Sequence, residues 1–158
     1  MRNPFLGAAR ATKLGAQLDA AASSLIAVLE LMDAEHWSVV SAPSVWSIGR
    51  EAAHVAEAAV YHQWIVRLTI GERVSARRPA IERQELTTSL TRGQAVDRIR
   101  DRTAEGVALI RCLADDQLDL LTRPPRARAS TLGETIDHVL IGHYDAHRLE
   151  IERKLRDM

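Results

Sequence analysis

Apolar residues recur every three to four positions in four long segments of the chain, and this spacing limits the fold more than any other feature of the sequence. In the first segment one helical face is formed by Leu14, Leu18, Ala21, Leu25 and Leu29. No segment of useful length alternates apolar and polar residues, and no Asn-Gly pair indicates a hairpin. We therefore predict an all-α protein.

Capping residues indicate where these helices begin. Ser47 precedes the second periodic segment, and Thr91 and Thr131 each have a Gln or Glu three residues later, the spacing of a capping box. The predicted helices cover about residues 12–33, 48–71, 92–113 and 132–156. The intervening residues 33–45, 72–90 and 115–130 contain Pro, Ser and Arg and are predicted to be loops.

Four helices of this length favour a helical bundle. Twenty residues make a helix about 30 Å long, and four such helices with apolar faces pack around one core. We expect a single four-helix bundle domain over residues 1–158. A chain of this length buries roughly 68–70% of its unfolded surface, so the core requires neither a disulfide nor a structural metal.

Composition excludes several classes of function. The 21 basic and 21 acidic residues give a net charge of zero, so we expect no general attraction to nucleic acid or to anionic lipid. No run of eighteen apolar residues occurs, which argues against a membrane-spanning helix. Cys112 is the only cysteine, so the chain can form no intrachain disulfide, and a cytoplasmic location fits this. We interpret Cys112 as a small core residue.

Two histidines interrupt the predicted apolar face of the last helix, which consists of Leu132, Ile136, Val139, Leu140, His143, His147 and Ile151. His143 and His147 are four residues apart, so they project from one face, the spacing by which a helix offers two imidazoles to one metal ion. An unpaired buried polar group costs a few kcal/mol, so each ring needs a partner. A shared metal would satisfy both; hydrogen bonds to carbonyls or exposure to solvent are the alternatives.

A third ligand would have to come from another helix. His54 and His62 both lie on the second helix, but they are rotated by about 80° and displaced by about 12 Å, so only one of them can belong to such a site. His138 lies on the face of the last helix opposite His147, and His36 lies in a predicted loop. We expect packing or solvent-exposed roles for these two.

The chain contains two longer motifs around these histidines: Trp46-Ser47 followed by His54, and Thr131-Leu132-Gly133-Glu134 followed by His143-Tyr144-Asp145-Ala146-His147. Together they resemble the motifs of the DinB/YfiT-like superfamily, and the match spans almost the whole chain. The resemblance implies an up-down-down-up four-helix bundle with a divalent metal held by His54, His143 and His147. The chain departs from the pattern at Arg50, where an acidic capping residue is usual.

Three histidine ligands leave coordination positions open, as in catalytic metal sites. A cation with only neutral ligands strongly lowers the pKa of a bound water or thiol. Relatives implied by the resemblance include S-transferases that use mycothiol, bacillithiol or glutathione, and a mycothiol-dependent isomerase. The bias toward arginine, with Lys13 and Lys154 the only lysines, favours mycothiol. Zn, Ni, Fe and Mn all suit such a site.

Charged residues near the histidines are candidates for other roles. Glu51 and Glu150, and also Glu57, are candidates to orient an imidazole or to move a proton. Arg67 and Arg148 are candidates to hold a carboxylate of the thiol or the substrate, together with Arg73, Arg126 and Arg128. For each of them a solvated helix or loop charge is the alternative. The three tryptophans are expected to pack in the core or at its rim.

The sequence therefore predicts a cytoplasmic, metal-dependent enzyme that transfers a low-molecular-weight thiol to an electrophilic small molecule, for detoxification or biosynthesis. Two alternatives stay open: a non-catalytic metal-binding or stress-response bundle, and an isomerase or hydrolase that needs no thiol. A small-molecule substrate is expected, with no nucleic-acid or membrane partner. The family resemblance also implies a homodimer.

Overall fold

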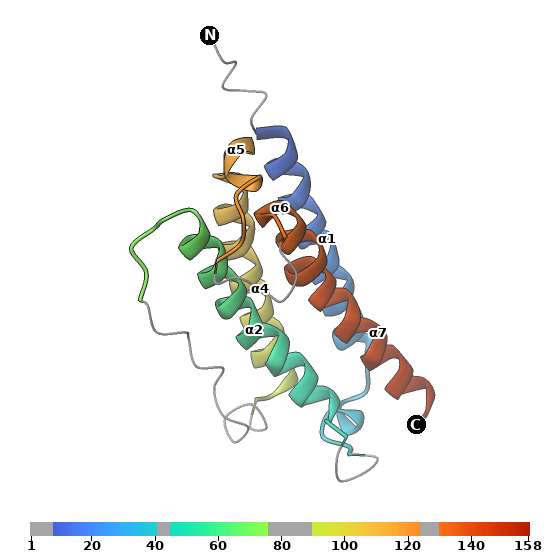
Figure 1. The fold of residues 1–158 in the computed structure, drawn as a ribbon. Helices are drawn as coiled ribbons and strands as arrows, with labels where there is room; N and C mark the ends of the chain where they lie inside the picture. The colour runs from blue at the N-terminus through green and yellow to red at the C-terminus, as the bar shows by residue number, and fades with distance from the viewer. Residues whose placement is uncertain (1–7, 41–44, 76–89, 124–129) are drawn as a thin grey trace.

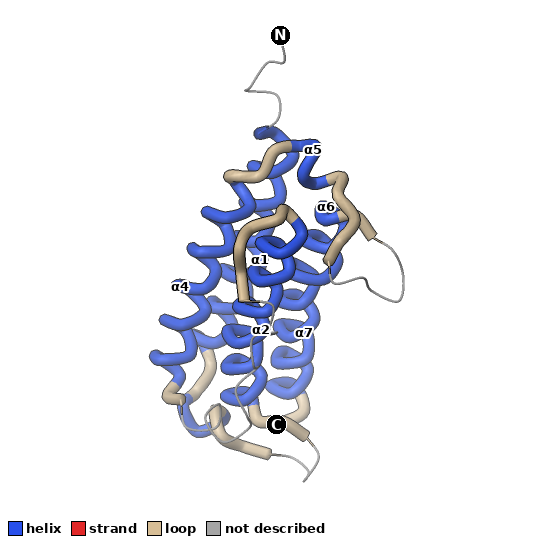
Figure 2. The backbone as a smooth tube through the Cα atoms, turned by 60° about the vertical axis from the view of Figure 1, so that its left-hand side comes forward, coloured by secondary structure: helices blue, strands red, loops and turns tan. Residues whose placement is uncertain are grey.

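Four long helices contain most of the residues that the computed structural model describes, which are residues 8–40, 45–75, 90–123 and 130–158 (Figure 1). Three of them are α1 (Ala8–Leu31), α2 (Ile48–Thr69) and α4 (Arg92–Arg111). The fourth begins as α6 (Leu132–Thr135), continues as η2 (Ile136–Ile141) and ends as α7 (Gly142–Arg156). The described residues contain no strand, only an isolated bridge between Leu121 and Thr131 (Figure 2). The prediction of an all-α four-helix bundle is confirmed.

The order of the helices around the bundle differs from their order in the sequence. Both α1 and α2 contact α4 and α7, so the order around the bundle is α1, α4, α2, α7. In Figure 1, α1 and α7 run in one direction and α2 and α4 in the other, which is the up-down-down-up topology. Residues 70–91 connect the parallel helices α2 and α4, and a chain of this length can extend well beyond the about 30 Å of a helix. Residues 76–89 lie outside the described part.

Side-chain caps fix the starts of three helices. The Ser47 hydroxyl accepts a hydrogen bond from the Arg50 backbone N–H, 3.2 Å away, so the unusual residue at position 50 leaves the cap of α2 intact. Reciprocal capping boxes form at Thr91 with Gln94 and at Thr131 with the residue three positions later. The sequence therefore located these starts correctly. Helix α1 begins at Ala8, about four residues before the predicted position.

Short helical turns occupy parts of two predicted loops. Ala34–His36 form a single 3-10 turn, η1, and Asp115–Leu118 form the short helix α5. Leu118 is completely buried, so α5 covers one end of the core. The prediction that residues 115–130 are entirely loop is therefore wrong at their start, and residues 124–129 lie outside the described part.

Cys112 does not lie in the core, contrary to the sequence prediction. It is exposed and caps the C-terminal end of α4. The apolar face of this helix continues instead from Ile110 to Leu113, both of which are buried. The chain leaves the helix at Cys112, so the helical spacing no longer predicts which side chain points inward there.

Helix α1 supplies a large part of the core. Leu18, Leu25 and Leu29 are almost completely buried where α1 packs against α4 and α7. Over Ala9–Leu31 this helix is long and apolar enough to cross a membrane, by length and composition alone. The core helix of a bundle meets the same criterion, so this single helix is weak evidence for a membrane span.

The last helix contains a π-helical segment, Ile136–Ile141, that the sequence analysis did not predict. Its buried row is spaced by four residues: Leu132, Ile136, Leu140 and Tyr144. In a regular α-helix four residues turn through about 400°, so a row with this spacing moves about 40° around the helix at each step. A π turn contains more residues, which offsets this rotation and keeps the row facing the core. Tyr144 is therefore buried, and Val139, which we placed on the buried face, is only partly buried.

Candidate metal centre

Three histidines from two helices converge inside the bundle. His54 of α2 and His143 and His147 of α7 each offer one ring nitrogen, and these three nitrogens lie within 4.8 Å of one another. The ring centroids are 5.1 Å apart for His54 with either of the others and 4.4 Å apart for His143 with His147. All three side chains are partly buried.

The fold explains this convergence. Helices α2 and α7 are neighbours in the bundle. His143 and His147 both follow the π segment, which ends at Ile141, so the regular one-turn spacing of α7 puts their rings on one face. His54 meets them from α2, seven residues after the cap at Ser47.

The histidine nitrogens suit a divalent metal. His143 Nε2 is buried and has no hydrogen-bond partner among the described residues. Burial lowers the pKa of His143 to about 3, with smaller contributions from the neighbouring histidines. Burial also lowers the pKa of His54, as does the nearby His147. Both imidazoles are therefore neutral at neutral pH, the form that binds a metal. Nitrogens on one tetrahedral zinc lie about 3.4 Å apart, a modest adjustment from the observed spacing.

Glu51 contacts His147, across the interface between α2 and α7. Its Oε2 atom lies 2.5 Å from His147 Nδ1, and its side chain is buried. Burial raises the pKa of Glu51, but the hydrogen bonds with His147 and Lys154 lower it, and the net pKa lies below the ordinary value. The ionised carboxylate accepts the Nδ1 hydrogen and leaves Nε2 of His147 as the nitrogen available to a metal.

Lys154 belongs to the same cluster, although the sequence analysis did not select it. Its Nζ atom lies 2.6 Å from Glu51 Oε1 and 2.8 Å from the Trp46 carbonyl oxygen. The side chain is only 6% exposed. Two signals in the sequence could have found it: Lys154 is seven residues after His147, on the same helical face, and a lysine on a buried face is rare.

Trp46 covers His54 from the loop before α2. The two rings are 5.1 Å apart in an edge-on arrangement. The guanidinium carbon of Arg50 lies 4.2 Å from the centroid of the Trp46 ring, a cation–π contact. This tryptophan therefore packs at the rim of the bundle, directly beside the histidine cluster.

The other candidate residues form ion pairs outside the histidine cluster. Glu150 binds Arg153 at 2.7 Å, Arg67 binds Glu72 at 2.7 Å, and Arg148 binds Glu152 at 2.6 Å. Glu57 lies 3.4 Å from Arg98, and Arg73 is exposed. Arg126 and Arg128 lie outside the described residues. The roles of Glu150, Arg67 and Arg148 stay predictions.

The remaining histidines are not part of the three-nitrogen group. The His62 ring packs against His143 with centroids 5.3 Å apart, so it borders the cluster without entering it. The side chain of His138 is 76% exposed, beside Asp137. His36 is half-buried in η1. Only one of the two α2 histidines thus contributes a nitrogen to the three-nitrogen group, as the helical geometry requires.

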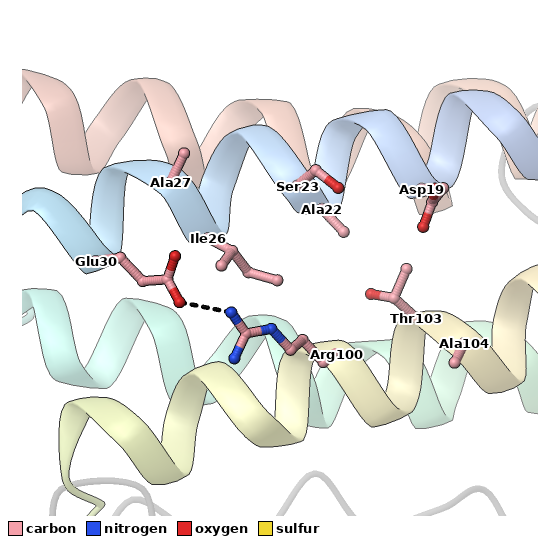
Figure 3. Close-up of a pocket in the computed structure, with 9 residues that line it drawn as sticks. All are labelled: Asp19, Ala22, Ser23, Ile26, Ala27, Glu30, Arg100, Thr103 and Ala104. Atoms are coloured by element: carbon pink, nitrogen blue, oxygen red, sulfur yellow. Dashed lines mark hydrogen bonds and ion pairs between the residues drawn. The ribbon is translucent and has the colours of Figure 1, made fainter.

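A groove of about 400 Å³ lies elsewhere, between α1 and α4 (Figure 3). Its walls are Asp19, Ala22, Ser23, Ile26, Ala27, Glu30, Arg100, Thr103 and Ala104, and the ion pair between Glu30 and Arg100 crosses it at 2.5 Å. In the order around the bundle, the interface between α1 and α4 lies on the side opposite the interface between α2 and α7. The groove is therefore separate from the histidine cluster.

Comparison with known protein families identifies one superfamily. The family model described as DinB superfamily matches residues 17–151, a range that includes the three histidines and Glu51 but ends before Lys154. A search of curated proteins gave no match.

Three solved structures share the fold. One is YfiT from Bacillus subtilis, described as a probable metal-dependent hydrolase with an unusual four-helix bundle topology (18% identity, TM-score 0.71, 92% of this chain and 87% of that one). A DinB-like protein from Bacillus cereus ATCC 10987 is 21% identical (TM-score 0.63, 87% and 85% covered). An uncharacterized protein from Clostridium difficile 630 is 12% identical (TM-score 0.70, 92% and 94% covered). At these identities the likeness shows the fold alone.

Proposed function

The chain belongs to the DinB superfamily, and we propose that it binds a divalent metal through His54, His143 and His147 and uses it to activate a low-molecular-weight thiol for transfer to an electrophilic small molecule. The observation that carries this proposal is the convergence of three ring nitrogens within 4.8 Å. Three neutral protein ligands leave part of the coordination sphere for a small molecule, the arrangement found in catalytic sites.

A bound divalent ion supplies a Lewis acid that lowers the pKa of a thiol or of water. The residues of the chain prepare this centre. The low pKa of His143 and of His54 keeps both rings unprotonated at neutral pH. Glu51 holds the Nδ1 hydrogen of His147 and so selects the ring nitrogen that faces the ion. The Trp46 ring packs edge-on against His54 and so restricts the movement of that ring.

The proposed thiol is of the mycothiol, bacillithiol or glutathione type, and the proposed metal is Zn, Ni, Fe or Mn. Elemental analysis of the purified protein should show about one divalent ion per chain. The metal-loaded protein is then assayed with a panel of thiols and electrophiles. His54→Ala should abolish both metal binding and thiol transfer, whereas His138→Ala, which removes an exposed histidine, should change neither. A parent protein that binds no divalent metal would contradict the proposal.

A second candidate function is hydrolysis without a thiol. YfiT, which shares the fold, is described as a probable metal-dependent hydrolase, and the same open centre can activate water. Turnover in the absence of any thiol, abolished by His54→Ala, would favour this function. A protein that binds metal but shows no turnover with or without thiols would favour the non-catalytic bundle.

A further inference from the structure

We propose that Lys154, which is not itself a ligand, is a positioning residue that fixes two of the three histidines of the metal centre. The inference rests on the proposed function in one respect: it takes His54, His143 and His147 as the metal ligands. Lys154 lies near the end of α7, two turns beyond His147, and its ammonium group turns inward to the start of α2. It therefore links the two helices that supply the ligands.

One contact of Lys154 acts on His147 through Glu51. Lys154 Nζ donates to Glu51 Oε1 at 2.6 Å, and the other oxygen of the same carboxylate lies 2.5 Å from His147 Nδ1. With both oxygens held, the carboxylate cannot rotate away from the imidazole. Lys154 thus maintains the hydrogen bond that presents His147 Nε2 to the metal.

A second contact of Lys154 acts on His54 through Trp46. Lys154 Nζ donates to the Trp46 carbonyl oxygen at 2.8 Å, and the indole ring of Trp46 packs edge-on against His54. The residue thereby ties the loop before α2 to the end of α7. Without this contact, the indole that covers His54 loses its backbone anchor.

Charge explains why a lysine occupies this buried position. Glu51 and Lys154 are both buried, and removal of one partner from a buried ion pair leaves an uncompensated charge. The only other carboxylate within ion-pair distance of Lys154 among the described residues is Glu150, 3.7 Å away and partly exposed. Without Lys154, the described residues leave Glu51 only its hydrogen bond with His147, so its carboxylate can change rotamer more readily.

The test compares metal affinity in matched variants. Zn²⁺ affinity is measured by competition with a chromophoric chelator for the parent, K154M, E51Q, the double variant E51Q/K154M, and R153M. Arg153 is the matched control, because it is a cation one residue away that is half exposed and pairs with Glu150 and Asp157. We expect K154M to weaken Zn²⁺ binding about 10- to 100-fold and R153M to change it less than about twofold.

The double variant tests the route of the effect. If Lys154 acts largely through Glu51, adding K154M to E51Q should cost much less affinity than adding it to the parent. Should K154M not fold, K154Q, whose neutral amide NH2 group is a hydrogen-bond donor without the positive charge, takes its place in the cycle. Affinity of the Lys154 variant within twofold of the parent would overturn the proposal, and an equal loss in both backgrounds would overturn the route through Glu51 and leave only the contact with Trp46.

A metal-free measurement keeps the two proposals distinguishable. In two-bond ¹H–¹⁵N spectra of the metal-free protein, His147 should carry its hydrogen on Nδ1 in the parent and in R153M, and should show a mixture of tautomers in the Lys154 variant. An unchanged tautomer would contradict this inference alone. A parent that binds no metal would contradict the proposed function, while the tautomer would still report whether Lys154 positions His147.

Discussion

His147 and Glu51 form a hydrogen bond between α7 and α2, with Nδ1 and Oε2 2.5 Å apart, although they are far apart in the sequence. The bond joins a candidate ligand to a buried carboxylate and spans the same interface as the three-histidine cluster. Changes at Glu51 should therefore affect both the metal centre and the stability of the bundle.

Replacement of Glu51 by alanine should weaken metal binding and destabilise the fold. His147 loses the acceptor that orients it, so Zn²⁺ affinity should fall about 10- to 100-fold. The buried Lys154 loses its partner carboxylate, which should cost about 3–5 kcal/mol in the free energy of unfolding. Chelator competition and urea unfolding measure the two effects. Glu105→Ala, which removes an exposed carboxylate paired with Arg102, should change both by little.

The stability of the metal-free protein should fall as the pH decreases below about 6.5. The pKa of His143 lies at about 3 in the folded chain and near 6.5 when unfolded, and the pKa of His54 is also lowered. Between these values the unfolded chain binds more protons, so acid favours unfolding. Urea unfolding in the presence of a chelator, between pH 7 and pH 5, avoids the titration of carboxylates. A free energy of unfolding that is flat or rises over this range would contradict the buried, neutral state of His143.

Two glycines at equivalent positions should respond oppositely to alanine. Gly49 is the second residue of α2, and a Cβ atom there would lie 2.7 Å from the Trp37 ring, so Gly49→Ala should cost about 1–3 kcal/mol. Gly93 is the second residue of α4, and a Cβ atom there would meet nothing within 4 Å. Gly93→Ala should stabilise the protein by about 0.4–1 kcal/mol. Thermal unfolding of the two variants side by side tests the contrast, which equal shifts would refute.

The buried hydrogen bond between Tyr144 and Thr103 should contribute to stability as a pair. The two oxygens are 3.2 Å apart, and both side chains are buried between α7 and α4. Tyr144→Phe and Thr103→Val should each lower the free energy of unfolding by about 1–2 kcal/mol, because each removes one hydroxyl and leaves the other buried hydroxyl without its partner. The double variant should cost less than the sum of the single ones. Urea unfolding of the three variants measures this coupling, and strict additivity would show that the two hydroxyls do not interact.

Local features of the fold could be predicted from the sequence, because local chemistry determines them. Ser47, Thr91 and Thr131 cap their helices through hydrogen bonds that span three residues. The pairing of His143 with His147 follows in the same way from the rise and twist of one helix.

Features that depend on packing between helices could not be predicted in this way. Helical geometry excluded His54 and His62 from binding one ion together, but only the family resemblance selected His54. The contact of Glu51 with His147, and the role of Lys154 beside it, depend on the position of α7 against α2. The π segment precedes the buried Tyr144 in the same helix, and a regular 3.6-residue period does not reveal it.

The diagonal placement of α1 and α2 has a consequence for folding. Consecutive helices in an up-down bundle can pair as soon as both exist, but here α1 and α2 meet chiefly through α4 and α7. The bundle therefore depends on contacts between segments distant in the sequence, which slows folding relative to a bundle of sequential hairpins. Two of the three histidines lie on α7, the last of the four helices in sequence order, so the three-nitrogen group forms only once α7 has packed against α2.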